Sequence, residues 1–148
     1  AYRANGWRDV YAEKVDELLT LFEDRQVFTV WLGLPVMRKD SMREQAERLN
    51  KIFAEVLEGR GADVNFLPTW DLTTDDNGEY SAYADLDNSG RTRQFRAKDG
   101  VHFTMMGYQY LARHVQEVIE HQYLARRKAA TQAESAPVGG LDPFSAQN

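Results

Sequence analysis

The segment that decides the fold is Val27–Leu32, which reads VFTVWL and is followed by Gly33 and Pro35. A short run of β-branched and aromatic residues is typical of a strand that is covered on both faces, as in a parallel sheet. A second run, Asp63–Leu67, is stopped by Pro68 in the same way. We therefore predict two buried parallel strands.

A predicted amphipathic helix precedes each of these strands. Apolar residues recur at helical spacing over Trp7–Phe22 and again over Met42–Leu57. Ser41 and Glu44 have the spacing of a capping box, which predicts Ser41 as the N-cap of the second helix rather than as a nucleophile. The order helix, strand, helix, strand predicts an α/β protein with a parallel sheet and crossover helices.

Residues 68–98 interrupt this order. Turn-forming residues at 75–78 and 85–90 surround a segment that is compatible with a short strand, and a second such segment follows at 91–96. We predict a β-hairpin insertion. Residues 85–90 also resemble the first half of a calcium-binding loop, but Arg96 stands where such a loop needs a bidentate glutamate, which disfavours calcium.

A third helix is predicted after Thr104, a good N-cap residue, with Phe103 and Tyr108 at the spacing of a hydrophobic staple. Its apolar stripe predicts that it ends at about Arg127. Residues 129–148 are rich in small and polar residues without periodicity, with Leu141 and Phe144 the only large apolar residues among them. We predict a disordered tail there, after a domain that covers residues 1–128.

The composition excludes several classes of protein. A hydrophobic content of 43% with 28% charged residues indicates a globular domain, and no apolar run approaches the roughly 18 residues that a membrane span needs. The net charge of −5 disfavours a nucleic-acid partner, although a local basic cluster is a candidate anion contact. The absence of cysteine excludes disulfides, thiolate metal sites and a cysteine nucleophile. The basic cluster consists of Arg91, Arg93, Arg96 and Lys98.

The segment Asp99–Thr104, DGVHFT, contains the candidate catalytic residues. It places a carboxylate and an imidazole three residues apart in a loop before the third helix. A carboxylate that accepts a hydrogen bond from one imidazole nitrogen leaves the other nitrogen free to take a proton from a nucleophile. We interpret His102 as a general base and Asp99 as its orienting partner; the alternative is a loop with a purely structural role.

The string Asp99–Tyr108, DGVHFTMMGY, resembles the final motif of the SGNH (GDSL-like) hydrolases, and Trp31–Pro35, WLGLP, resembles that family's strand-end W-x-G-x-P. The resemblance covers roughly residues 5–125 and is greatest to a branch of exported, largely uncharacterised bacterial proteins. It implies a three-layer α/β/α flavodoxin-like fold. It also implies that His102 and Asp99 complete a Ser-His-Asp triad, with no cofactor and no metal.

The other motifs of that family do not occur here. None of the serines lies in G-D-S or in G-x-S-x-G. The resemblance therefore implies the C-terminal portion of the fold, associated with a missing N-terminal half that holds the nucleophile and the oxyanion donors. Two parallel strands are also too few to cover three apolar helix faces, which independently indicates an incomplete sheet. The serines are Ser41, Ser81, Ser89, Ser135 and Ser145.

The leading hypothesis is a serine ester hydrolase, an esterase, acetylesterase or acyl transferase, acting on an ester or acetylated carbohydrate. Tyr80, Tyr83 and Arg93 of the predicted hairpin are candidate substrate-binding residues, and the resemblance alone predicts a periplasmic or exported protein. One alternative is a non-catalytic SGNH-like module that binds an envelope glycan or a protein. Another is a regulatory fragment whose fold depends on a second chain. His114 and His121 on the third helix are interpreted as solvated rather than as metal ligands.

Overall fold

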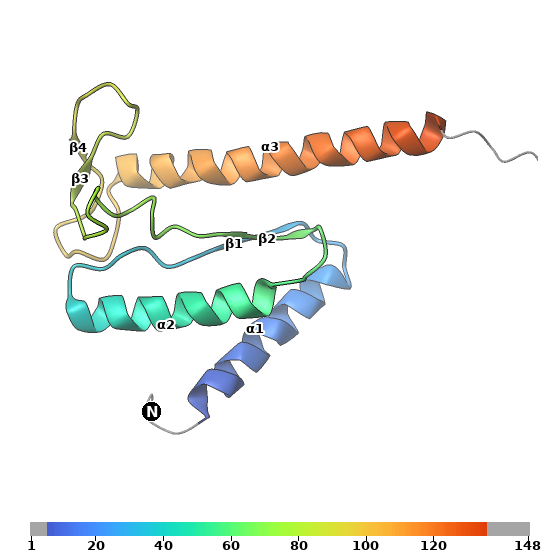
Figure 1. Ribbon diagram of the computed structural model, residues 1–148, viewed down its shortest axis with the longest axis horizontal. Helices are drawn as coiled ribbons and strands as arrows, with labels where there is room; N and C mark the ends of the chain where they lie inside the picture. Colours follow the sequence, from blue (N-terminus) through green and yellow to red (C-terminus); the bar gives the residue numbers. More distant parts are fainter. Residues whose placement is uncertain (1–5, 136–148) are drawn as a thin grey trace, which may run out of the picture.

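The chain alternates helices and strands in the predicted order (Figure 1). A computed structural model describes residues 6–135. Helix α1 (Trp7–Glu23) is followed by β1 (Thr29–Leu32), and helix α2 (Asp40–Leu57) is followed by β2 (Val64–Leu67). The structure is therefore a mixed α/β fold, as the alternation of helical and strand patterns predicts.

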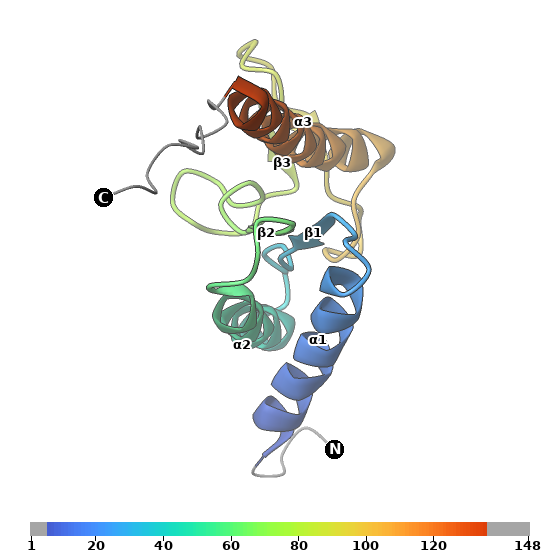
Figure 2. The same ribbon diagram turned by 90° about the vertical axis from the view of Figure 1, so that its right-hand side faces the viewer.

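Strands β1 and β2 pair in parallel, with Thr29 opposite Val64 and Leu32 opposite Leu67. Helices α1 and α2 lie on one face of this sheet and α3 (Met105–Ser135) lies on the other, which gives three layers (Figures 1 and 2). The strands are half-buried rather than fully buried, and Leu32 is 39% exposed. The reason is that each strand has only one neighbour among the described residues.

The main core lies between α1, α2 and the face of the sheet that these two helices cover. Val15 and Leu19 of α1 pack with Phe53 and Leu57 of α2. The ring of Trp31 in β1 meets Phe53 edge-on, with 5.2 Å between ring centroids. A second group of apolar side chains on α1 is exposed instead of packed in this core, and it consists of Val10, Leu18 and Leu21.

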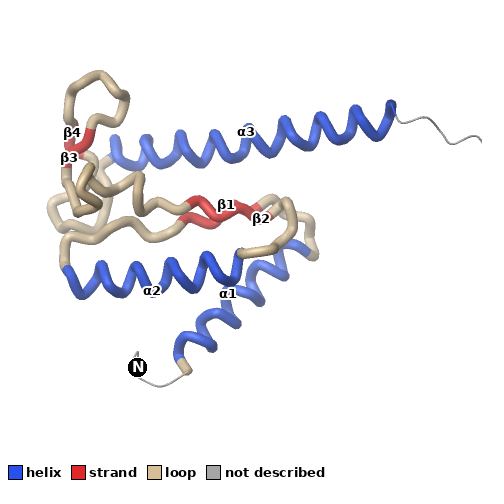
Figure 3. Tube along the Cα trace, in the orientation of Figure 1, coloured by secondary structure: helices blue, strands red, loops and turns tan. Residues whose placement is uncertain are grey.

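The predicted hairpin is present. Strands β3 (Tyr83–Ala84) and β4 (Arg93–Gln94) pair in antiparallel fashion beside the first turns of α3 (Figure 3). In the turn between them the carboxylate of Asp85 accepts the backbone N–H groups of Ser89 and Gly90, at 3.0 and 2.6 Å. The acidic side chain that suggested half of a calcium loop thus organises the turn itself. Within residues 6–135 no group of three or more His, Asp or Glu side chains is arranged to hold a metal ion.

The predicted N-cap of α2 is wrong. The helix begins at Asp40, and Lys39 is its N-cap, without a side-chain capping bond. The carbonyl oxygen of Lys39 accepts the backbone N–H groups of Met42 and Arg43, both at 2.9 Å. The side chain of Arg43 pairs with Asp40 within this first turn, and Ser41 lies inside the helix rather than at its N-cap.

Helix α3 is longer than predicted and continues to Ser135. Residues 129–135, where we predicted the start of a disordered tail, are helical. Alanine has the highest helix propensity, so Ala129 and Ala130 favour continuation of the helix beyond Arg127. The rest of the predicted tail, including Leu141 and Phe144, lies outside the described residues. None of the described helices is both long and apolar enough to cross a membrane.

Candidate active site

Asp99 and His102 meet in the loop between β4 and α3. The Nδ1 atom of His102 lies 2.7 Å from Oδ2 of Asp99. The other carboxylate oxygen, Oδ1, accepts the backbone N–H groups of Val101 and His102, at 2.8 and 3.0 Å. One oxygen of Asp99 therefore shapes the loop while the other orients the imidazole. The structure brings together the two residues that the sequence predicts as a pair, and their catalytic role stays a prediction.

The electrostatics of this pair favour an ionised carboxylate. The hydrogen bond from His102, followed by the backbone N–H bonds of Val101 and His102, holds the pKa of Asp99 well below its ordinary value. An ionised Asp99 can only accept, so Nδ1 must bear the proton in their hydrogen bond and Nε2 is left free as an acceptor. The side chain of His102 is 69% exposed and that of Asp99 is 50% exposed, so a reacting group can approach Nε2.

Gly100 determines the path of the loop between the two residues. Its φ is +76°, a left-handed conformation that favours glycine, and a Cβ at this position would overlap the side chain of Arg38. The carbonyl oxygen of Gly100 accepts the backbone N–H of Arg38 at 3.2 Å, and the guanidinium of Arg38 donates to the carbonyl of Lys98. The Asp99–His102 loop is thus attached to the segment that follows β1.

The start of α3 holds the other end of the loop. Thr104 Oγ1 accepts the backbone N–H of Gly107 at 3.3 Å, which confirms the predicted N-cap. The predicted hydrophobic staple is also confirmed, because the rings of Phe103 and Tyr108 meet edge-on with 5.6 Å between centroids. Gly107 has no space for a Cβ, since its backbone packs against the carbonyl oxygen of Phe95.

Arg96 is the residue near this site that sequence reasoning placed wrongly. We counted it in a basic cluster that could contact anions at the surface, but its side chain is fully buried. Its guanidinium donates from Nη1 to the carbonyl of Val36 at 2.7 Å and from Nη2 to the carbonyl of Val101 at 3.0 Å. Burial lowers the pKa of this guanidinium from its ordinary value. No local signal separates Arg96 from Arg93, because its partner Val36 is 60 residues earlier in the chain.

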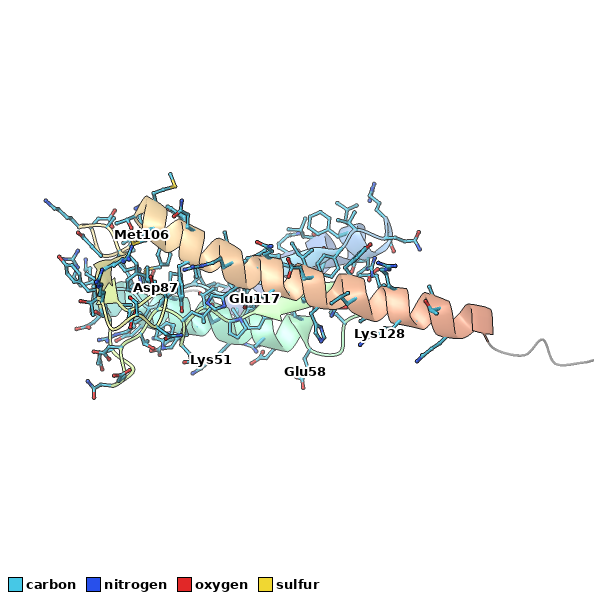
Figure 4. All side chains as sticks on the ribbon, turned by 90° about the horizontal axis from the view of Figure 1, so that it is seen from above. Lys51, Glu58, Asp87, Met106, Glu117 and Lys128 are labelled. Carbon is cyan, nitrogen blue, oxygen red and sulfur yellow. The ribbon has the colours of Figure 1, made fainter. Side chains whose placement is uncertain are left out.

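The three predicted substrate-binding residues lie in different environments. The Tyr80 ring packs over the guanidinium of Arg96, with the Cζ atom 5.0 Å from the ring centroid, and its hydroxyl is buried. Tyr83 in β3 is exposed. Arg93 lines a cavity of about 430 Å³ between the hairpin turn and α3, whose other lining residues include Asp87 and Met106. Figure 4 shows these two residues at the N-terminal end of α3.

None of the serine hydroxyls in the described part of the chain is hydrogen-bonded to His102. The hydroxyl of Ser81 donates to the carbonyl of Tyr83 at 2.7 Å, so this serine belongs to the hairpin. Ser41 lies in the first turn of α2, and Ser89 lies in the hairpin turn. The described residues thus contain a paired acid and base without a serine hydrogen-bonded to the base.

Gly100→Ala is expected to destabilise the protein more than Gly78→Ala. Both glycines have positive φ values, +76° and +78°, so both alanines pay a similar conformational cost of roughly 1–2 kcal/mol. Only the Cβ at position 100 meets a neighbour, the side chain of Arg38, whereas position 78 is open. Urea unfolding of the two variants measures the difference. Equal losses of unfolding free energy would contradict the close packing of Arg38 on this loop.

Asp99→Asn is expected to destabilise the fold in a pH-dependent way. The pKa of Asp99 is lower in the folded protein than the value of about 4 in the unfolded chain, so its ionised form stabilises the fold above about pH 4. This contribution is lost as the pH falls through the lower, folded-state pKa. Urea unfolding at several pH values should show that the difference in unfolding free energy between wild type and variant becomes smaller below about pH 4. Asp76→Asn, on an exposed turn, is the control. If the difference in unfolding free energy between wild type and Asp99→Asn stayed constant with pH, the pairing of Asp99 with His102 would be contradicted.

The comparison with known proteins identifies a family without a described activity. A family model described as "Protein of unknown function (DUF459)" matches residues 1–118. The match includes both parallel strands, the hairpin, the Asp99–His102 loop and the first turns of α3. No curated protein matches the chain. Since the matched region covers most of its length, the chain belongs to the DUF459 family.

Proposed function

We propose that this chain supplies the general base and its orienting carboxylate to an SGNH-type serine hydrolase that acts on ester bonds. The observation that supports this function most directly is the 2.7 Å contact between His102 Nδ1 and Asp99 Oδ2, with the imidazole exposed. A carboxylate in this position selects the imidazole tautomer that accepts a proton at Nε2. The resemblance of DGVHFTMMGY to the final SGNH motif agrees with this assignment.

The reaction needs a serine that His102 can deprotonate. The serine oxygen attacks the ester carbonyl while its proton moves to Nε2 of His102, and Asp99 stabilises the imidazolium that forms. When the tetrahedral intermediate collapses, the same proton passes from Nε2 to the leaving alcohol and an acyl-serine remains. Water then releases the acid in a hydrolase, or a second alcohol accepts the acyl group in a transferase. Neither a metal nor a cofactor is part of this proposal.

We infer that the serine and the oxyanion donors belong to a polypeptide segment outside these 148 residues, a missing N-terminal portion that packs beside β1. Three features support this. No described serine bonds to His102. The outer edge of β1 is unpaired among the described strands. Helix α1, which lies below β1 in Figure 2, exposes the apolar side chains Val10, Leu18 and Leu21 next to its packed face.

The substrate proposal is an ester or an acetylated carbohydrate, and the proposed location is periplasmic or exported. The cavity that contains Arg93 is the candidate site for an oxygen-rich substrate, because guanidinium and amide groups line it beside Asp87, which pairs with Arg93 at 3.5 Å. Exposed Tyr83 stays a candidate for contact with the substrate. Tyr80 is better assigned to the support of Arg96, since its hydroxyl is buried.

His102→Ala in the full-length protein, including the proposed N-terminal portion, should lower kcat for p-nitrophenyl acetate by about 10³-fold or more. The melting temperature should fall only modestly, because the imidazole is mostly exposed and the backbone N–H bonds to Asp99 remain in the variant. His114→Ala is a matched control, since His114 also contacts a carboxylate three residues away, Glu117, but on the side of α3. It should leave kcat unchanged.

Equal turnover by wild type and His102→Ala would contradict the proposed role of His102. If the folded wild-type protein had no esterase activity but bound an envelope glycan with an affinity that survives His102→Ala, the function would instead be that of a binding module.

A further inference from the structure

Arg96 is a buried cation without a carboxylate partner. Its side chain is fully buried, and within residues 6–135 no Asp or Glu forms an ion pair with it. Burying an unpaired charge is unfavourable unless its hydrogen bonds are satisfied by other groups. The groups that contact Arg96 therefore indicate its role in the structure.

Two of the hydrogen bonds of Arg96 join the candidate catalytic loop to the segment after β1, and Nη2 also contacts Sδ of Met37 in that segment at 3.9 Å. Nη1 donates to the carbonyl of Val36, and Nη2 donates to the carbonyl of Val101, the residue immediately before His102. The rigid planar guanidinium holds these two acceptors in a defined relative position, which the single ammonium of a lysine cannot reproduce.

Two aromatic rings fix the plane of the guanidinium. Its Cζ atom lies 4.5 Å from the centroid of the Phe103 ring and 5.0 Å from that of Tyr80. Phe103 is the residue immediately after His102, so Arg96 contacts the chain on both sides of the imidazole. Cation–π contacts strengthen when they are removed from water, as here.

The backbone closes the base of the same loop. Arg96 and Phe103 form an antiparallel β-bridge, and the N–H of Ala97 donates to the carbonyl of His102 at 2.8 Å. These bonds define where the loop begins and ends. The contact of Arg96 with Val101 then restricts the peptide that sets the direction of the His102 side chain.

We propose that Arg96 is a positioning residue for His102: by binding Val36 and Val101 it holds the imidazole where Nδ1 donates to Asp99. This inference rests on the proposed function, because the orientation of the ring matters for catalysis only if His102 is the base. It goes beyond that function by assigning a role to a buried side chain that touches no reacting atom.

The test is the tautomer of neutral His102, measured by ¹⁵N NMR of the imidazole in the full-length protein. Wild type should contain mainly the Nδ1–H form, in agreement with its bond to Asp99. Arg96→Met removes both donors and should make Nε2–H the major form. Arg96→Lys keeps the charge but cannot bind both carbonyls in the same geometry, so an intermediate ratio is expected.

Two further variants distinguish a specific effect of Arg96 on His102 from a general loss of stability and from loss of the Asp99 acceptor. Arg60→Met is the stability control: Arg60 is also nearly buried and pairs with Asp16 and Glu23, but it joins α2 to α1. It should lower the melting temperature and leave the tautomer unchanged. Asp99→Asn replaces the acceptor by an amide that can donate to Nδ1, so it should shift His102 to Nε2–H without any change at Arg96.

A wild-type tautomer ratio in folded Arg96→Met would overturn the proposal. If that variant does not melt cooperatively, Arg96→Lys decides alone, and an unchanged ratio there has the same meaning. If Asp99→Asn shifts the ratio and the Arg96 variants do not, only the role of Arg96 fails. If Asp99→Asn itself has no effect, the pairing on which the proposed function rests fails, and this inference fails with it.

Discussion

The site depends on how the irregular segment Gly33–Met37, which is buried apart from half-buried Leu34 and Pro35, satisfies its backbone hydrogen bonds. Backbone groups removed from water need partners, and this segment is outside any sheet or helix. Side chains from three later parts of the chain supply these partners. The side-chain amide of Asn50 in α2 binds both the N–H and the carbonyl of Leu34. The hydroxyl of Thr69 donates to the carbonyl of Gly33. At Val36, the N–H donates to the hydroxyl of Thr73 and the carbonyl accepts from Arg96. The end of β1, α2, the segment after β2 and the candidate catalytic loop are thereby joined at one place.

Local sequence patterns predicted most of the fold and the central pair of the site. The apolar run at Val27–Leu32 predicted β1, and the spacing from Thr104 to Tyr108 predicted the cap and the staple of α3, because neighbouring residues determine these features. Asp99 and His102 were predictable for the same reason. The burial of Arg96 was not, since Val36 is far away in sequence. The wrong cap at Ser41 is a local error, since the helix begins at Asp40 with Lys39 as its N-cap.

The way in which the fold holds Asp99 and His102 bears on their proposed function. A short loop brings a carboxylate and an imidazole together, and the N-cap of α3 and the buried Arg96 restrict that loop at both ends. Such preorganisation is what proton transfer requires, because a base must already point at the group it deprotonates. The half-open sheet beside β1 agrees with a nucleophile that comes from outside these residues.

Labelling the full-length protein with a fluorophosphonate, and locating the label by mass spectrometry, tests whether His102 activates a serine outside these 148 residues. We expect one labelled serine outside the present residues in wild type, and loss of labelling in folded His102→Ala. No labelling of the wild type, or equal labelling of both proteins, would contradict this role of His102.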